Sequence, residues 1–181
     1  MDINAYLKSL TLALCLTLGV GTYCYAETPP YVPNKIDFNE ENAVGLVEDL
    51  RTYALTIAQK YVQRYGGFAP FGVTITLQGE YQVIVGNGKD AKKDLAMLFN
   101  AYRKKAQSNE IVAAAVVYDT RMNVPNENRV SDAIYITVDS KLTRSNNGFA
   151  FYTKVRPGHY RFDNLRSHSI DQTKIFRRAS R

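Results

Sequence analysis

The feature that most constrains the fold is the segment 111–118, IVAAAVVY, in which no polar side chain precedes the final tyrosine. A strand exposed on one face alternates apolar and polar residues, whereas a strand that is apolar on both faces needs cover on both. We therefore expect 111–118 to be a central strand, covered on both sides or packed under a helix.

Periodic segments precede this strand. Residues 44–65 place apolar side chains at steps of three and four and end at Gly66-Gly67, which predicts a long amphipathic helix. Residues 73–77 and 81–85 are joined by a short turn that contains a glycine. This pattern predicts an antiparallel hairpin.

A second helical pattern begins at residue 91, and two further strands are expected at 133–138 and 149–155, joined through the turn-like sequence SNNG. The order helix, two strands, helix, three strands predicts a single α+β domain. Its sheet should be mainly antiparallel with two helices packed on it. We place this domain at 37–155.

The first 26 residues predict export. One basic residue, Lys8, precedes a short apolar run, and the small residues Cys24 and Ala26 offer a cleavage site. A signal peptide at 1–26 makes the protein periplasmic or, alternatively, secreted. Lipidation at Cys24 is less favoured because bulky Tyr23 precedes it. Both cysteines, Cys15 and Cys24, lie in the segment to be removed, so no disulfide or thiol chemistry is expected.

The regions on either side of the predicted domain differ in composition. Residues 27–36, ETPPYVPNKI, contain three prolines and should form an extended leader. Residues 156–181 form a basic C-terminal extension. From residue 141 to residue 181 there are ten Lys or Arg and two Asp, which accounts for the formal net charge of +6. Such an end attracts polyanions or an acidic partner protein, although it is also typical of a solvated tail. The candidate binding residues are Arg156, His159, Arg161, Arg166, Arg177 and Arg178.

The turn VIVGNGKDAKKDL at 83–95 resembles a phosphate-binding loop. Gly86, Gly88 and Ala91 have the spacing G-x-G-x-x-G/A between a strand and a helix, and Lys89 adds a charge. The preceding strand belongs to a hairpin, however, and Asp119 follows at more than the usual distance of about 20 residues. We therefore expect a structural turn, with Asn87 capping the helix, and no bound nucleotide or other cofactor.

One geometric test separates these interpretations of the turn. A structural turn requires 83–85 to run antiparallel to 73–77 at a sheet edge. A nucleotide site requires that strand to lie parallel beside 111–118, with Asp119 opposite the turn.

Polar residues gather in the loop after the central strand. Asp119, Glu127 and Asp132, with support from Arg121, could perform glycan hydrolysis if two carboxylates lay about 5–10 Å apart. The alternative is an ion-paired loop between two strands, which we favour. The histidines, His159 and His168, are nine residues apart and match no metal-binding pattern, so no metal is expected.

Three segments resemble a group of small bacterial proteins. They share an aromatic-Pro-Phe-Gly segment, a D-G-E-like turn, a D-x-R strand end and a D-A-I strand. The matching residues are Phe68, Pro70, Phe71, Gly72, Asp119, Arg121, Asp132, Ala133 and Ile134; Gln78-Gly79-Glu80 departs at the first turn position. The element order is similar to that of profilin and roadblock-like domains. Both resemblances concern the fold and imply no activity.

Together these patterns favour an exported, non-enzymatic binding or interaction protein with a protein partner in a bacterial envelope. An inhibitor or immunity protein is one such type. Tyrosine and arginine, which are frequent here, are enriched in recognition surfaces. The alternatives are an envelope hydrolase that uses the loop carboxylates, and attachment to an anionic surface through the basic tail.

Overall fold

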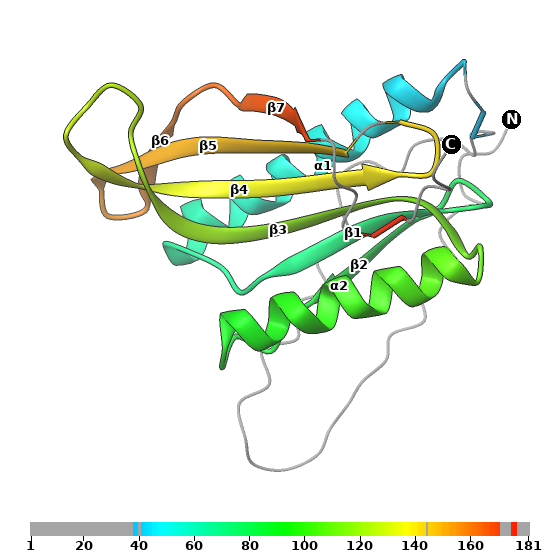
Figure 1. The fold of residues 1–181 in the computed structure, drawn as a ribbon. Coiled ribbons are helices and arrows are strands. Elements are labelled where there is room, and N and C mark those ends of the chain that lie inside the picture. Colours follow the sequence, from blue (N-terminus) through cyan, green and yellow to red (C-terminus); the bar gives the residue numbers. More distant parts are fainter. Residues whose placement is uncertain (1–37, 40, 144, 171–174, 177–181) are drawn as a thin grey trace, which may run out of the picture.

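The computed structural model describes residues 38–39, 41–143, 145–170 and 175–176 (Figure 1). Within them the chain forms two helices and seven strands. These are α1 (Ala43–Tyr65), β1 (Phe71–Thr76), β2 (Tyr81–Val85), α2 (Ala91–Gln107), β3 (Ile111–Asn123), β4 (Val130–Ser140), β5 (Ser145–Arg156), β6 (His159–Phe162) and β7 (Arg166–Ile170).

All seven strands form one antiparallel sheet, with the order β2-β1-β3-β4-β5-β6. β5 has two partners on its outer side. Its first half pairs with β7 and its second half with β6. The predicted α+β class, the hairpin and the order of the elements through β5 are confirmed.

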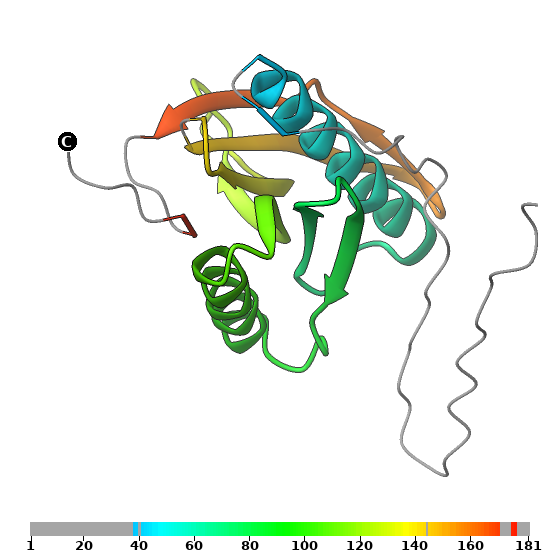
Figure 2. The ribbon, with the colours of Figure 1, turned by 90° about the vertical axis from the view of Figure 1, so that its right-hand side faces the viewer.

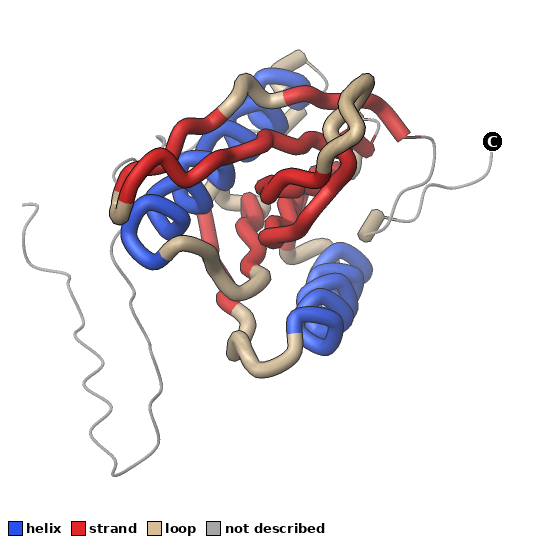
Figure 3. Tube along the Cα trace, turned by 90° about the vertical axis from the view of Figure 1, so that its left-hand side faces the viewer, coloured by secondary structure: helices blue, strands red, loops and turns tan. Residues whose placement is uncertain are grey.

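The central strand is covered on both faces, as its composition predicts. Ala113, Ala115 and Val117 pack in the cluster under α1, whereas Ala114 and Val116 pack in a second cluster that includes α2. Figures 2 and 3 show the two helices on opposite sides of the sheet. Small alanines in β3 let both helices approach closely.

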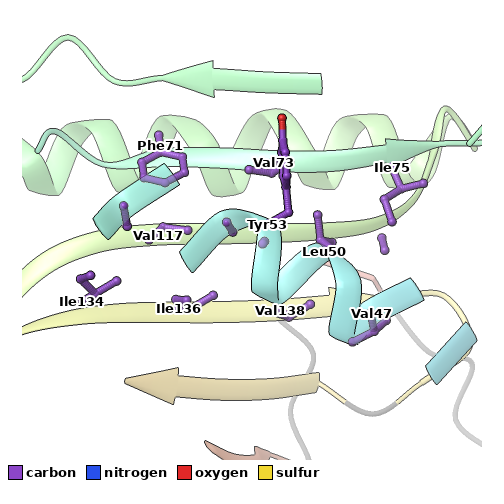
Figure 4. Close-up of a cluster of buried hydrophobic side chains, with 14 of the residues drawn as sticks. Val47, Leu50, Tyr53, Phe71, Val73, Ile75, Val117, Ile134, Ile136 and Val138 are labelled. Atoms are coloured by element: carbon purple, nitrogen blue, oxygen red, sulfur yellow. The ribbon is translucent and has the colours of Figure 1, made fainter. Parts of the chain in front are cut away.

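The core between α1 and the sheet contains most of the large buried side chains. Figure 4 shows Leu50 and Tyr53 of α1 over the sheet, with Tyr53 extending past Val73 of β1. Both belong to one buried cluster with Val117, Ile136 and Val138 of β3 and β4. Leu50 is fully buried, so its replacement by alanine would remove about 2–5 kcal/mol of stability. The helix ends as predicted at Gly66, whose φ of 82° suits a left-handed cap.

Two expectations about local structure need correction. The sequence SNNG, expected to be a turn, forms the first residues of β5, because Asn146, Asn147 and Gly148 pair with β4. The chain reverses earlier, over the described residues 141–143. Turn-forming residues are tolerated inside this strand because it has partners on both sides.

The folded unit also extends beyond the expected boundary at residue 155. Residues 159–170 supply β6 and β7, and Ile175 and Phe176 are buried against α2. Short strands and single apolar residues have no sequence period, which is why the C-terminal extension looked unstructured. The signal peptide and the leader lie outside the described residues.

Candidate functional site

The glycine turn is a structural corner. β2 runs antiparallel to β1 at an edge of the sheet, which is the arrangement assigned above to a structural turn. The backbone N–H groups of Asn87 and Gly88 donate to the two carboxylate oxygens of Asp94, at 3.2 and 2.9 Å. Asp94 is buried in the first turn of α2. The anion that these two donors bind is therefore part of the chain itself.

The two glycines serve this turn in different ways. A Cβ on Gly86 would lie 2.6 Å from Cγ of Asp94, so only glycine permits the carboxylate to approach. Gly88 has a φ of 72°, which favours glycine. Lys89 is exposed, and its N–H donates to the side chain of Asn87. Asp90 rather than Asn87 caps α2, because its carboxylate accepts the N–H of Lys93.

The loop carboxylates are placed on two strands and a connecting loop. Arg121 lies opposite Asp132 in the β3–β4 register, and their side chains form an exposed ion pair at 3.4 Å. Glu127 forms an ion pair with Arg129 within the loop. Two of the three candidate acids are thus paired with arginines, as the alternative of an ion-paired loop predicts.

Asp119 is the third candidate acid and the least exposed. Its carboxylate accepts a hydrogen bond of 2.8 Å from the hydroxyl of Tyr152, and it packs against Gly67 at the end of α1. Burial raises the pKa of Asp119, the Tyr152 hydrogen bond lowers it, and the charge of Asp132 raises it. Asp119 and Asp132 therefore interact electrostatically, while Glu127 is held by Arg129.

The basic candidates of the C-terminal region lie on the last strands. Arg156, His159 and Arg161 are exposed on the β5–β6 hairpin. Arg166 on β7 is also exposed, and its guanidinium carbon lies 5.9 Å from the ring centroid of Phe151. Arg177 and Arg178 lie outside the described residues.

A buried carboxylate that was not predicted anchors the C-terminal region. Asp139, at the end of β4, is fully buried. One oxygen accepts the hydroxyl of Ser145 at 2.8 Å, and the other accepts the N–H groups of Ile175 and Phe176 at 2.8 and 3.1 Å. Figures 2 and 3 show this short segment beside α2. The segment 175–176 is thereby fixed on the α2 side of the sheet.

One sequence signal could have found Asp139. It directly follows the strand expected at 133–138, and a strand that continued to residue 139 within the core would bury it. A charged residue inside such a strand must have partners, because an unpaired buried charge is strongly unfavourable. The identity of those partners was not accessible, since they lie 36 and 37 residues away.

Comparisons add no family to this description, because no family model, curated protein or solved structure matches the chain. Within the described residues, no cluster of three or more His, Cys, Asp or Glu could hold a metal ion. Neither helix in that part of the chain is long and apolar enough to cross a membrane.

Proposed function

We propose that this chain is an exported, non-enzymatic binding protein of a bacterial envelope, and that it recognises an acidic surface on a partner protein. The observation that carries the proposal is the basic hairpin, which we define as Lys154, Arg156, His159 and Arg161 on β5 and β6. All four side chains are exposed. Within the described residues, Lys154, Arg156 and Arg161 form no ion pair.

Aromatic side chains pack the basic hairpin against β5 and the end of α1, which favours a defined partner. Tyr160 and Phe162 of β6 pack on Tyr152 of β5, with ring centroids 5.9 Å apart in both pairs. Tyr160 also lies next to Gly66 at the end of α1. Cations at fixed positions favour recognition of a complementary protein surface, whereas attachment to an anionic membrane requires only net charge.

The polar groups considered for chemistry bind other groups of the same chain. The N–H groups of the glycine turn bind Asp94, and two of the loop carboxylates bind arginines. Surface ion pairs of this type are frequent and contribute little to stability. These contacts support the binding hypothesis over the hydrolase hypothesis.

The test compares two charge-reversed variants of equal net charge. The triple variant Lys154→Glu, Arg156→Glu, Arg161→Glu alters the basic hairpin, and Lys92→Glu, Lys93→Glu, Lys104→Glu alters exposed lysines of α2. Each variant is used to capture proteins from envelope extract, and captured proteins are purified and tested again for 1:1 binding. We expect the wild type and the α2 variant to retain one stoichiometric partner and the hairpin variant to lose it.

Two outcomes contradict the proposal. Equal retention of the partner by both variants would show that the basic hairpin is not the contact. Binding of the wild type to phosphatidylglycerol vesicles, with no stoichiometric protein partner, would instead assign the hairpin to membrane attachment.

A further inference from the structure

β2 forms one edge of the sheet, and no described strand pairs with its outward side. Within the part of the chain that the structure describes, β1 is its one strand partner. Figure 4 shows β2 beyond β1, outside the side chains that pack under α1. An open edge strand presents a row of backbone donors and acceptors to solvent.

The hydrogen-bond register identifies which groups point outward. At the two ends of the β1–β2 pair, the N–H of Gly86 donates to the carbonyl of Pro70 at 2.7 Å, and that of Thr76 donates to Glu80 at 2.9 Å. In an antiparallel pair every second residue forms these bonds. The even-numbered residues of β2 therefore bond to β1.

It follows that Val83 and Val85 direct their N–H and C=O groups away from β1, whereas Gln82 and Ile84 direct theirs toward it. Because Val83 and Val85 are separated by one residue, their outward groups match the spacing of a strand that adds to the edge.

One face of this edge is apolar and poorly covered. Val83 lies opposite Val73, so both valines of β2 lie on the side of the sheet that carries α1. α1 packs mainly on β1, β3, β4 and β6. It reaches β2 at Tyr81, whose ring centroid lies 5.1 Å from that of Tyr53. The side chains of Val83 and Val85 remain 39% and 48% exposed. An added strand would cover them with its own apolar residues.

The other face of the edge carries a lysine. Gln82 points to the α2 side, where the ammonium group of Lys105 donates to its side-chain oxygen at 3.1 Å. A strand that adds here meets Lys105 on the α2 side, so a carboxylate on that side complements it.

We propose that β2 accepts an extended segment of a protein partner, apolar on the α1 side and acidic on the α2 side. This inference rests on the proposed binding function and adds a second contact, at the sheet edge opposite the basic hairpin. A second copy fits poorly, because two-fold pairing of β2 would bring both Lys105 side chains to the same face. The leader fits poorly too, since its three prolines lack N–H donors.

The test adds the peptide acetyl-Val-Glu-Val-Glu-Val-amide to the full mature chain in solution. Amide hydrogen exchange of the protein is then measured with and without the peptide. We expect the peptide to slow exchange at Val83 and Val85 while leaving Gln82 and Ile84 unchanged, because the latter two already bond to β1. The same peptide methylated on the nitrogens that face β2, and its counterpart with Lys in place of Glu, serve as controls.

Two variants of the protein sharpen this test. Val83→Pro removes an outward N–H without removing a bond to β1. Val83→Thr is its control, because it changes the side chain and keeps that N–H. Unchanged exchange at Gln82 and Ile84 in the proline variant shows that β2 still pairs with β1. We expect peptide binding to weaken about tenfold in Val83→Pro. Lys105→Glu should weaken it about two- to fivefold and favour the Lys peptide.

Three results overturn the inference. The first is that the peptide slows exchange at Gln82 and Ile84 as much as at Val83 and Val85, and the second is that the Glu and Lys peptides bind equally well. The third is that exchange slows with rising protein concentration while the mass of the protein in solution doubles. The last result would assign the edge to a second copy. The basic-hairpin variant distinguishes this inference from the proposed function. It should lose the envelope partner and still bind the peptide as the wild type does.

Discussion

Asp94 and Asp139 perform the same chemical task in two regions of the molecule. Each carboxylate is buried, and each accepts two backbone N–H groups. The donors of Asp94 lie six and seven residues away in the exposed glycine turn. Those of Asp139 lie 36 and 37 residues away, in a segment that is itself buried.

The difference shows what a buried carboxylate contributes in each setting. Near its donors, Asp94 shapes a turn that the hairpin and α2 already bring together. Far from them, Asp139 fixes where a distant segment joins the domain, and no other described polar contact holds Ile175 and Phe176. The loop closed by Asp139 is longer than the one closed by Asp94, so closing it costs more conformational entropy.

The largest expected effect is therefore that of Asp139→Ala. It leaves three buried donors without their acceptor, and we expect a loss of about 3 kcal/mol in the free energy of unfolding. Urea denaturation measures this loss. Amide exchange should accelerate at Ile175 and Phe176 before the sheet opens.

Ser145→Ala is the matched control, because it removes one donor to Asp139 and leaves the other two. It should lower stability by about 1 kcal/mol and keep both C-terminal amides protected. If Asp139→Ala left those amides protected as well, the carboxylate would not be what anchors them.

Asp94→Ala should have a smaller effect, about 1–2 kcal/mol in urea denaturation, because water replaces the lost acceptor for the exposed Asn87 and Gly88. Exchange should accelerate at these two amides alone. Faster exchange at Ile175 or Phe176 in this variant would mean that the two anchors are coupled, and the comparison between them would fail.

Gly86→Ala tests whether the close approach of Asp94 requires a glycine. The added Cβ displaces the carboxylate, so we expect a loss of about 1–2 kcal/mol. The loss becomes partly smaller in the Asp94→Ala background, where Cγ is absent but Cβ, 2.8 Å from the added atom, remains. Gly88→Ala should lose about 1 kcal/mol in both backgrounds, since its effect comes from a positive φ. Equal behaviour of the two substitutions would contradict this distinction.

Asp119 provides the smallest effect, because its carboxyl is only half-buried and its donor is a side chain. Its pKa is raised above the ordinary value of 3.8. The folded state therefore binds the proton more tightly, and stability falls as pH rises from about 3.8 through the raised pKa. Asp119→Asn should flatten this fall in urea denaturation measured against pH.

Tyr152→Phe should change the same profile in the opposite direction. It removes the hydrogen bond that lowers the pKa of Asp119. The pKa then rises further, and the fall in stability with pH becomes steeper and extends to higher pH. An unchanged profile in both variants would show that Asp119 does not titrate differently in the folded and unfolded chain.

Much of the fold could be predicted because its determinants are local and periodic. Residues 111–118 are apolar on both faces, and the hairpin alternates around Gly79, so strand, partner and direction followed from neighbouring residues. β6 and β7 were missed because they are short and form only by pairing with β5. Their positions depend on tertiary contacts rather than on a sequence period.

The candidate site was less predictable for a related reason. The spacing of Gly86 and Gly88 indicated a turn that gathers N–H donors, but not that Asp94 would fill it. The ion pair of Arg121 and Asp132 depends on the β3–β4 register, which residue spacing alone does not define. The open edge at β2 became visible only once the strand order was known.

The anchoring of the C-terminal segment also sets a condition on biosynthesis. A chain is made from its N-terminus, so Asp139 is synthesised 36 residues before the first of its backbone donors. Until Phe176 has followed, Leu98 and Tyr102 of α2 lack part of their cover. Nascent chains that stop short of this point would leave Asp139 without two of its donors. They would also display an apolar patch, which is the feature that chaperones recognise.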